Sequence, residues 1–339
     1  MVGVVQPGYG FEILQPLPKK PIIPQDNLQS PAKIHLGRQL FFDPRLSLTG
    51  AFSCNHCHNM LLGGTDGRTT ADGMGGHSLK RNTPSLWNVA YQTVLFWDGR
   101  AQSLETQFLE HIFDKTVMAM PDEQALVARL RQIPGYDEQF RRVFKEPNIT
   151  SLLVAKAVAS YIRTLISPDS PFDQFIKGKK TALSAQARRG LKEFQEVQCV
   201  ACHFGVNFAG PAPGPALKMG DGFYELFPNY LGTEYEAPMA LTADLGRYHV
   251  THEAGHKYMW RVPPLRNIAL TAPYFHNGSA ATLADAVKVM AKTQLKRQLS
   301  TQQVDDIVAF LNSLTGKTAV HVPPTLPPTP NFTVFPIKQ

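Results

Sequence analysis

The chain has 339 residues, of which 43% are hydrophobic and 18% charged, and its formal net charge at pH 7 is +7. The positive charge is spread along the chain without a dense Lys/Arg block, which argues against a nucleic-acid-binding protein. No apolar run approaches the roughly 20 residues that a membrane-spanning helix needs, which excludes a transmembrane segment.

The first half of the chain alternates between helical and loop-like patterns. Residues 1–25 are rich in Pro and predict an extended arm, after which Ser30-Pro31 opens a helix with Pro at its first position. The stretch Leu48–Ser85 is a long loop rich in Gly, which could not bury a core by itself, so we expect it to fold around a bound group. Helical patterns return at Asp122–Ile133 and at Ile149–Leu165.

The second half begins where Ser167-Pro168-Asp169 interrupts the helical pattern, and this break predicts a domain junction. The predicted domains are therefore residues 26–166 and 167–320. Ser184 is expected to cap a helix that leads directly into Cys199. Residues 205–247 are again rich in Gly and Pro and predict a second long loop.

Two helices are predicted near the end of the chain, Thr282–Leu295 and Ser300–Leu314. The second opens with Ser300-Thr301-Gln302-Gln303, which is a capping-box pattern. The Pro-rich residues 321–339 predict a second extended arm. Signals for β-strands are few, so the expected fold class is mainly α.

All four cysteines lie in two copies of one pattern, Cys54-Asn55-His56-Cys57-His58 and Cys199-Val200-Ala201-Cys202-His203. C-x-x-C-H is the attachment signature of c-type haem, in which both thiols bond the porphyrin and the His lies under the iron. A redox dithiol needs no following His, and a zinc site made of four thiolates would leave both histidines unused. We therefore expect two covalently attached haem c groups.

Each motif falls in its own half of the chain, which predicts two cytochrome c-like domains that each wrap one haem c with long Gly/Pro-rich loops. The second axial site of each iron decides the function. A Met or a second His gives an electron-transfer haem, whereas an open or displaceable position gives a haem that binds peroxide. Composition does not choose among the remaining His, Met and Tyr residues.

Three further segments carry a family resemblance: Phe96-Trp97-Asp98-Gly99-Arg100, Ser170-Pro171-Phe172-Asp173, and the long run from Pro263 to His276. Together with the order and spacing of the haem motifs, they resemble the bacterial dihaem cytochrome c peroxidase family, which also contains MauG. The resemblance covers roughly residues 30–315, nearly the whole chain.

The resemblance implies different roles for the two haems. His58 would be the proximal ligand of a low-potential, peroxide-reacting haem, and His203 that of a high-potential haem through which electrons enter. Met290 matches the family's distal ligand to the second haem, where a thioether raises the potential. MauG has a Tyr at this position, so Met290 favours the peroxidase-like arrangement. Trp97 matches the tryptophan that lies between the two haems.

The peroxide-reacting pocket departs from the family pattern. Cleavage of peroxide needs a group that moves a proton from the near to the far oxygen. The family uses a Glu supported by a Gln; Gln107 matches the Gln, but Val117 stands at the position of the Glu. Glu110, His111 and Asp114 are close enough in sequence to substitute, and His111 is the best of them.

Two more sites follow from the resemblance. His77, flanked by Gly75 and Gly76, matches a loop histidine that caps the resting peroxide-reacting haem in many members, although the loop between His77 and Asn82 is shorter here. Asn82 and the carbonyls of Thr271 and Pro273 match a structural Ca²⁺ site, for which an all-oxygen ligand set is suited.

Three functions remain open from the sequence. The first is a peroxidase that reduces hydrogen peroxide to water with electrons that pass from the Met290 haem by way of Trp97. The second is a MauG-like enzyme that uses a high-valent dihaem state to oxidise a residue of a partner protein; Val117 motivates it, and Trp260 would be an exit point. The third is a dihaem electron carrier whose irons bind neither cyanide nor peroxide.

Partners and location are expectations of the same kind. Hydrogen peroxide, a small donor cytochrome c or cupredoxin, or a protein substrate would be the partners, and a homodimer is left open. Haem is attached to c-type cytochromes outside the cytoplasm, so we expect a periplasmic protein. Met1–Gly10 lacks the features of a secretory signal, so we expect the export signal to be absent from this sequence.

Overall fold

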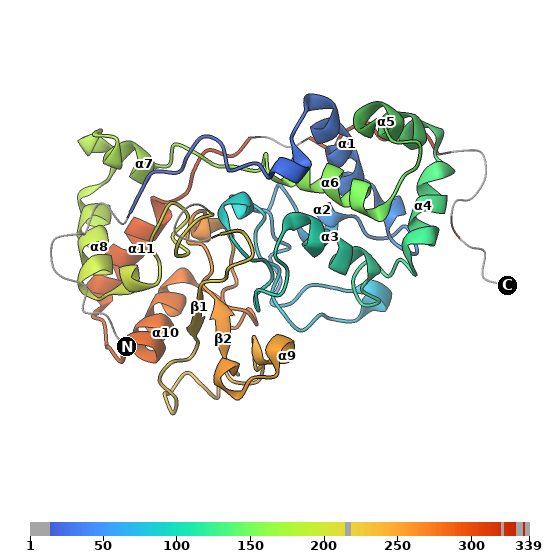
Figure 1. Ribbon diagram of the computed structural model, residues 1–339. Helices are drawn as coiled ribbons and strands as arrows, with labels where there is room; N and C mark the ends of the chain where they lie inside the picture. The colour runs from blue at the N-terminus through green and yellow to red at the C-terminus, as the bar shows by residue number, and fades with distance from the viewer. Residues whose placement is uncertain (1–13, 214–217, 320–321, 330–334, 336–339) are drawn as a thin grey trace. The chain divides into compact units, whose positions relative to one another are not determined.

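The computed structural model describes residues 14–213, 218–319, 322–329 and 335 (Figure 1). The described residues form two compact units. The first, here called the N-unit, comprises residues 21–90, 101–166 and the described residues from 319 onward. The second, here called the C-unit, comprises residues 14–20, 91–100 and 167–318. One boundary between the units falls at Ser167, and residues 91–100 group with the C-unit.

Helices provide most of the regular structure in both units. The N-unit holds α1 Pro31–Phe42, α2 Cys54–Cys57, α3 Leu104–Phe113, α4 Glu123–Arg131, α5 Pro134–Phe144 and α6 Ser151–Ile162. The C-unit holds α7 Pro171–Ile176, α8 Ala185–Glu196, α9 Tyr248–Thr251, α10 Leu283–Leu295 and α11 Thr301–Asn312. Its two short strands, β1 Tyr224–Leu226 and β2 Met259–Arg261, pair antiparallel with Glu225 opposite Trp260. The prediction of a mainly α fold is confirmed.

Several helices begin at a side-chain cap, and the cap at Ser184 and the capping box at Ser300 are predicted from the sequence. Ser30, Ser184 and Thr282 each accept a hydrogen bond from a backbone N–H in the first turn of the helix that follows. The capping box at Ser300 is confirmed, since Ser300 Oγ accepts from Gln303 N–H and the Gln303 side chain accepts from Ser300 N–H. No helix among the described residues is long and apolar enough to cross a membrane.

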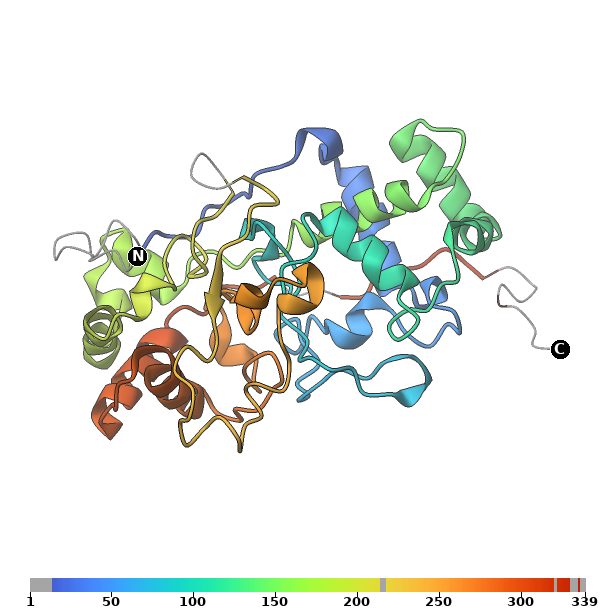
Figure 2. The same ribbon diagram turned by 60° about the horizontal axis from the view of Figure 1, so that its bottom comes forward.

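Each unit contains one close helix crossing that depends on a glycine. In the N-unit α1 packs on α6, and in the C-unit α8 packs on α11 (Figure 2). A Cβ on Gly37 would overlap the carbonyl oxygen of Ala157, and a Cβ on Gly190 would overlap that of Asp306. The two crossings therefore have the same construction, with one helix backbone lying directly against the next.

We expect Gly190→Ala to lower the free energy of unfolding by about 1–3 kcal/mol, because the added methyl group forces α8 away from α11. Guanidinium unfolding followed by circular dichroism measures this. Gly255→Ala is the control, since no atom lies within 4 Å of a Cβ at that position. Equal stability of the two variants would show that the crossing tolerates separation.

Two stretches of the chain also share a local backbone pattern at a constant separation in sequence. Asn88 and Asn267 have φ of 62° and 60°, and Phe96 and Phe275 have φ of 64° and 74°. These are left-handed conformations that non-glycine residues seldom adopt. Between them lie two matching short 3-10 helices, Val89–Tyr91 and Ile268–Leu270. Residues 267–280 thus repeat the local structure of residues 88–101.

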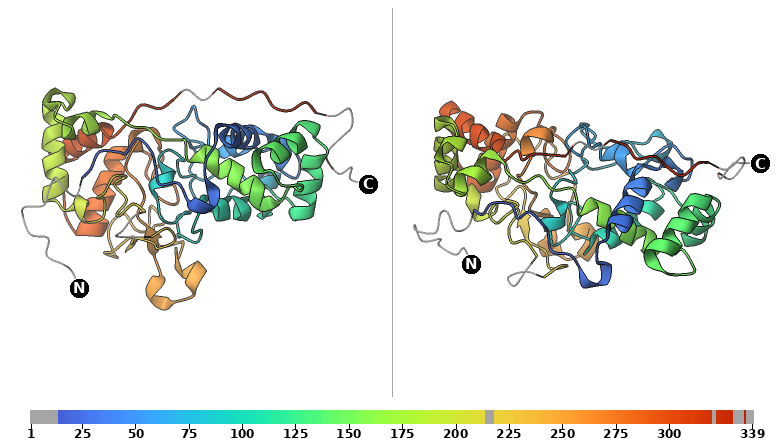
Figure 3. Two further views of the ribbon diagram at one scale, coloured as in Figure 1. Left: turned by 45° about the horizontal axis from the view of Figure 1, so that its top comes forward. Right: turned by 90° about the horizontal axis from the view of Figure 1, so that it is seen from above.

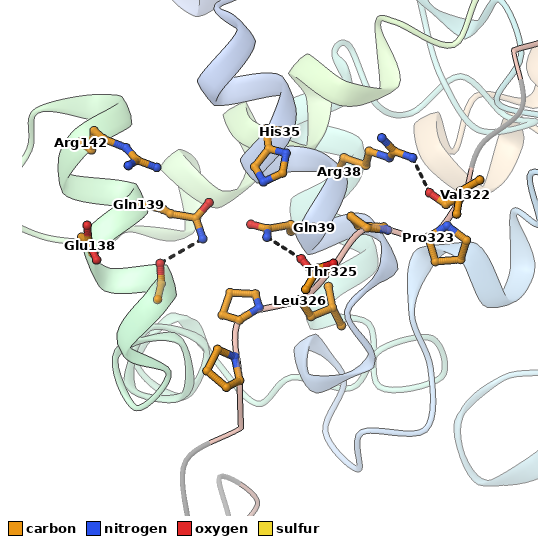
Figure 4. A pocket seen from close by; sticks show the side chains of 14 residues that line it. His35, Arg38, Gln39, Glu138, Gln139, Arg142, Val322, Pro323, Thr325 and Leu326 are labelled. Atoms are coloured by element: carbon orange, nitrogen blue, oxygen red, sulfur yellow. Dashed lines mark hydrogen bonds between the residues drawn. The ribbon is translucent and has the colours of Figure 1, made fainter.

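Both expected arms have an irregular, extended backbone where they are described. Residues 1–13 lie outside the described residues, but Leu17 N–H donates to Asp173 Oδ1 at 3.0 Å and Leu17 is buried. At the other end, residues 322–329 run along α1 as an extended stretch of chain (Figure 3). Gln39 donates to Thr325 O at 2.7 Å, and His35 and Glu138 line an open pocket beside this stretch (Figure 4).

Candidate haem-binding and peroxide-reacting sites

The first attachment motif forms the single turn α2 together with the residue that follows it. His58 N–H donates to Cys54 O at 2.9 Å, which fixes the ring relative to the two cysteines. The imidazole of His58 is half-buried with its Nδ1 shielded from solvent, and burial lowers its pKa while the carbonyls of Gly64 and Pro84 oppose this. A neutral buried imidazole is the form that binds iron.

The second motif is built in the same way around the 3-10 turn Cys199–Ala201. His203 N–H donates to Cys199 O at 3.0 Å, and His203 Nδ1 lies 3.0 Å from Phe208 O. Because Nδ1–H can donate to that carbonyl, the lone pair of Nε2 is left for a metal, which is the arrangement that orients a ligating His. Burial lowers the pKa of His203 as well. The residues present therefore fit a proximal haem ligand.

The four thiols do not fit a zinc site. Burial raises the pKa of Cys54, Cys199 and Cys202 to about 12 and that of Cys57 to about 11, because the thiolate is disfavoured away from water. Within the described residues no three His, Cys, Asp or Glu side chains are placed to hold a metal ion. Two separate haem attachment sites account for the cysteines better than one shared metal.

Met290 and Trp97 lie in one apolar cluster of the C-unit. Phe227, Leu241, Trp260 and Val289 form its buried centre, and both Met290 and Trp97 pack against that centre. Trp97 is half-buried, and its carbonyl accepts from Arg261 N–H at 3.0 Å, so β2 holds the segment in place. The structure therefore brings together two of the residues that the resemblance singles out.

Trp260 is not exposed as an exit point would be. Its ring is 4% exposed, its Nε1–H donates to Phe227 O at 3.2 Å, and it stacks on His276 with ring centroids 4.1 Å apart. Its position inside the Met290 cluster makes it an internal aromatic neighbour of Trp97 rather than a surface residue.

Two arginines beside Trp97, the buried Arg261 and the half-buried Arg247, are not predicted from the sequence. Arg261 donates from Nε to Phe96 O at 3.0 Å, and burial lowers its pKa to about 10. Arg247 donates to Tyr224 Oη at 2.6 Å and to Asp98 O at 3.0 Å. Such cations suit the carboxylates of a haem propionate. A buried Arg has no sequence signature of its own, so only the adjacency of Arg261 to Trp260 could have indicated it.

Gln107 and His111 meet on α3 in the N-unit. Gln107 Nε2 lies 3.1 Å from His111 Nδ1 and 3.4 Å from His111 Nε2, as expected for residues one helical turn apart. Both side chains are half-buried. Of the groups that could replace the family's Glu, His111 is therefore the one in contact with Gln107.

The other candidates near Val117 are placed differently. Asp114 is exposed, and its carboxylate accepts from the backbone N–H and the hydroxyl of Thr116 at 2.7 and 2.6 Å, so it caps a turn. Glu110 is half-buried on α3. Val117 itself is half-buried and apolar, with its N–H donating to Asp114 O at 3.0 Å.

His77 lies on an exposed loop. Gly75 and Gly76, with φ of 76° and 78°, shape a short 3-10 turn before it, and the ring of His77 is exposed. Gly73 N–H donates to His77 O at 2.7 Å, and Met74 N–H donates to Thr116 O at 2.8 Å. A backbone hydrogen bond thus connects the loop to the segment that contains Val117, while the imidazole faces solvent.

The residues expected to bind calcium belong to different units. Asn82 lies in the N-unit, is buried, and donates from Nδ2 to Arg68 O at 2.8 Å. Thr271 and Pro273 lie in the C-unit, where the hydroxyl of Thr271 donates to Ile268 O at 3.1 Å. These contacts define the local surroundings of each residue.

Comparison with known proteins gives a consistent answer. Residues 31–181 match the family model described as di-haem cytochrome c peroxidase. The chain is 38% identical to a cytochrome c551 peroxidase of Pseudomonas aeruginosa, over 96% of this chain and 91% of that protein. It is 35% identical to a methylamine utilization protein MauG of Methylorubrum extorquens, over 90% of this chain and 84% of that protein.

A solved structure resembles the fold over its whole length. It is that of a MauG-like protein associated with microbial copper homeostasis, with a TM-score of 0.79, 28% sequence identity, and coverage of 94% of this chain and 96% of that one. Together with the two attachment motifs and their histidines, these similarities imply haem c as the cofactor. The chain is an oxidoreductase that belongs to the dihaem cytochrome c peroxidase family, which includes MauG.

Proposed function

We propose that this protein is a dihaem c-type peroxidase that reduces hydrogen peroxide to water with electrons from a small cytochrome c or cupredoxin. The cluster that contains both Met290 and Trp97 carries this proposal, because it joins an electron-entry ligand and an aromatic relay in one apolar environment. When bound, the haems supply the redox-active irons that take up electrons and react with peroxide. Two cytochrome c-like domains, one per haem, are part of the same proposal.

Electron entry is assigned to the C-unit. The Nδ1–H of His203 donates a hydrogen bond to Phe208 O, and this fixes the orientation of the ring that would ligate the iron on one side. Met290 would ligate it on the other side and favour the reduced state. Trp97, which packs against the same cluster as Met290, would then pass electrons toward the haem of His58.

Proton movement is assigned to α3. Peroxide cleavage needs one group that takes a proton from the near oxygen and returns it to the far oxygen. The imidazole of His111 can do both, and the carboxamide of Gln107, 3.1 Å away, would hold its orientation. Val117 offers neither a donor nor an acceptor on its side chain, so His111 takes the role that a Glu has elsewhere in the family.

The direct test adds peroxide to the fully haem-loaded protein in the presence of a reduced small cytochrome or cupredoxin. Oxidation of two donor molecules per peroxide, followed optically, supports the peroxidase. If cyanide and peroxide perturb neither haem, the protein is an electron carrier and the proposal fails.

Trp97→Phe should slow peroxide turnover at least tenfold, while reduction of the Met290 haem by the donor stays at the wild-type rate. A phenyl ring keeps most of the apolar contact but is much harder to oxidise than an indole. Stopped-flow absorbance separates the two steps. Trp87→Phe, at a buried position of the N-unit, is the matched control, and equal slowing in both variants would remove Trp97 from the electron path.

The second candidate is a MauG-like activity, in which peroxide oxidises a residue of a partner protein. Val117 favours it, because slow proton transfer would let oxidising equivalents persist on the two haems. Trp97 and Trp260 in one cluster would offer aromatic side chains for their transfer. A near-infrared band that outlives peroxide addition in the absence of donor supports this candidate, and immediate return to the resting spectrum argues against it.

Three lesser assignments complete the proposal. Asn82, Thr271 and Pro273 would bind Ca²⁺, and chelation of Ca²⁺ should lower activity if they do. His77 would cap the haem of His58 in some state of the protein. A periplasmic location is proposed from the chemistry of haem attachment; labelling of the protein in intact cells and spheroplasts tests it, and light scattering tests for a homodimer.

A further inference from the structure

The C-terminal arm is defined here as residues 322–329 together with Phe335, and it belongs to the N-unit. Half of residues 322–329 are prolines, which have no N–H to donate, so this stretch is bound through its carbonyl oxygens. From α1, Gln39 Nε2 donates to Thr325 O at 2.7 Å, and Arg38 donates to another carbonyl of the arm (Figure 4). Such a stretch loses little conformational freedom when it binds, because each proline already has a fixed φ.

The α1–α2 connection, residues 43–53, lies against the arm. Arg45 donates from Nη2 to Pro327 O at 3.0 Å and from Nη1 to Thr329 Oγ1 at 3.3 Å. Pro327 is buried, and a Cβ on Gly135 would lie 2.8 Å from Pro327 Cβ, so the start of α5 packs on the same residue. The connection and α5 together therefore hold the arm at Pro327.

Phe335 contacts the same connection nearer to the haem attachment motif. A Cβ on Gly50 would overlap the ring of Phe335, which therefore lies directly on the backbone at this position. The guanidinium of Arg129 lies 4.8 Å from the centre of the same ring in a cation–π contact. Arg129 is buried and donates to Arg45 O at 3.1 Å and to Leu48 O at 3.3 Å. This one side chain thus joins the arm to the α1–α2 connection.

The α1–α2 connection in turn holds two loops together. Leu48 N–H donates to Met118 O at 2.9 Å, and Thr49 Oγ1 lies 3.6 Å from Met74 Sδ. Met74 N–H donates to Thr116 O at 2.8 Å. The two loops are therefore bonded to each other as well as to the connection, and a shift of the connection would loosen both.

The connection and the loop that holds Met74 also contact the first attachment motif. Phe52 N–H donates to Ser47 Oγ at 3.2 Å, and the rings of Phe52 and His56 lie edge to face with centroids 4.5 Å apart. The carbonyl oxygen of Asp72 lies 3.9 Å from Cys57 Sγ. A chain of contacts therefore leads from the arm to the residues that attach the first haem.

We propose that the C-terminal arm is a latch for the loops beside the first haem. While the arm is bound, the α1–α2 connection keeps the loops of Met74 and Met118 in place. When the arm leaves, both loops loosen and the His58 haem becomes more accessible. Residues 322–328 border an open pocket, so the arm is not enclosed by the fold and can leave without unfolding it. The inference requires the haem of this family but neither peroxide turnover nor an electron donor.

The test is hydrogen exchange of the oxidised, haem-loaded protein, followed by mass spectrometry. In Phe335→Ala, exchange at the Leu48 and Met74 amides should be about tenfold faster, while α6 keeps its wild-type rates. Val322→Ala, whose side chain is 62% exposed at the far end of the arm, should change neither amide. Wild-type rates at both amides in Phe335→Ala would overturn the proposal, as would equal acceleration in α6.

A chain that ends at Thr318 supplies a second readout. It should show the same fast exchange, and a synthetic peptide of residues 319–339 should restore slow exchange in a saturable manner. The same peptide with Phe335→Ala should require a higher concentration. Absence of restoration by the wild-type peptide would contradict the latch. If circular dichroism shows that the shortened chain is unfolded, Phe335→Ala in the full chain decides.

Cyanide reports on access to the haem itself. It should bind the oxidised, haem-loaded Phe335→Ala protein about tenfold faster than the wild type, and Val322→Ala at the wild-type rate. An unchanged rate in Phe335→Ala would show that the arm does not control the haem site. Peroxide turnover of the wild type, measured separately, reports on the proposed function alone.

Discussion

Replacing Arg266 by Met should lower the free energy of unfolding of the C-unit by about 3–5 kcal/mol, because it leaves a buried carboxylate without its counter-ion. Both side chains of the Arg266–Asp173 pair are 0% exposed, with Nη2 of Arg266 2.9 Å from Oδ1 of Asp173. Arg266 also donates to the carbonyls of Gln15 and Val206, so the loss frees two backbone acceptors. Guanidinium unfolding of the haem-loaded protein measures the effect.

The control is the double variant Arg266→Met with Asp173→Leu. Removal of both charges should recover part of the lost stability, since the cost of a broken buried pair lies mainly in the charge left behind. Asp173 also accepts from the N–H groups of Leu17 and Ser170, so recovery will be incomplete. Additive losses in the double variant would show that the two residues act through separate contacts.

Replacing Cys199 and Cys202 together by Ala should leave one covalent haem instead of two and reduce peroxide turnover with an external donor to background. The two thiols hold the only attachment site of the C-unit that the sequence provides. Without it, the His203 haem has no covalent anchor, and electrons from the donor lose their entry point. Haem staining of the denatured protein and donor oxidation measure the two effects.

The matched variant replaces Cys54 and Cys57 by Ala. It should also keep one covalent haem, which the donor still reduces but which does not react with peroxide. The two variants thus measure electron entry and the reaction with peroxide separately. Peroxide reactivity that survives in the Cys54/Cys57 variant and disappears in the other would reverse the roles assigned to the two haems.

The sequence predicts the helix starts well and the short helices poorly. Caps such as Ser184 and Ser300 act within one turn, so their effect is visible in the local sequence. In contrast, α3 has only ten residues, which is too short for a clear periodic pattern. The helix α5 begins at Pro134, and a proline at this position is equally typical of the end of the preceding helix. Because α3 is not predicted, the contact between Gln107 and His111 at helical spacing could not be derived either.

The candidate site is predictable where a covalent motif defines it and not where distant segments build it. The haem cysteines and histidines follow from ten residues of sequence. The surroundings of Trp97 depend on Arg261, whose Nε bonds the carbonyl of Phe96 across 165 residues, and no periodicity indicates such a pairing. The repeat of residues 88–101 in residues 267–280 depends on left-handed residues that are recognised only in the structure.

The placement of the N-terminal segment has a consequence for the order of folding. Leu17 bonds Asp173 across 156 residues, and Gln15 bonds Arg266 across 251 residues, so the first described residues are held by residues that are synthesised much later. During synthesis on a ribosome or passage through a translocation channel, this segment cannot complete its contacts until residue 266 has emerged. The N-unit helices, whose partners lie nearer in sequence, can pack first. Refolding should therefore show ordering of α1 and α6 before protection of the Leu17 amide from hydrogen exchange.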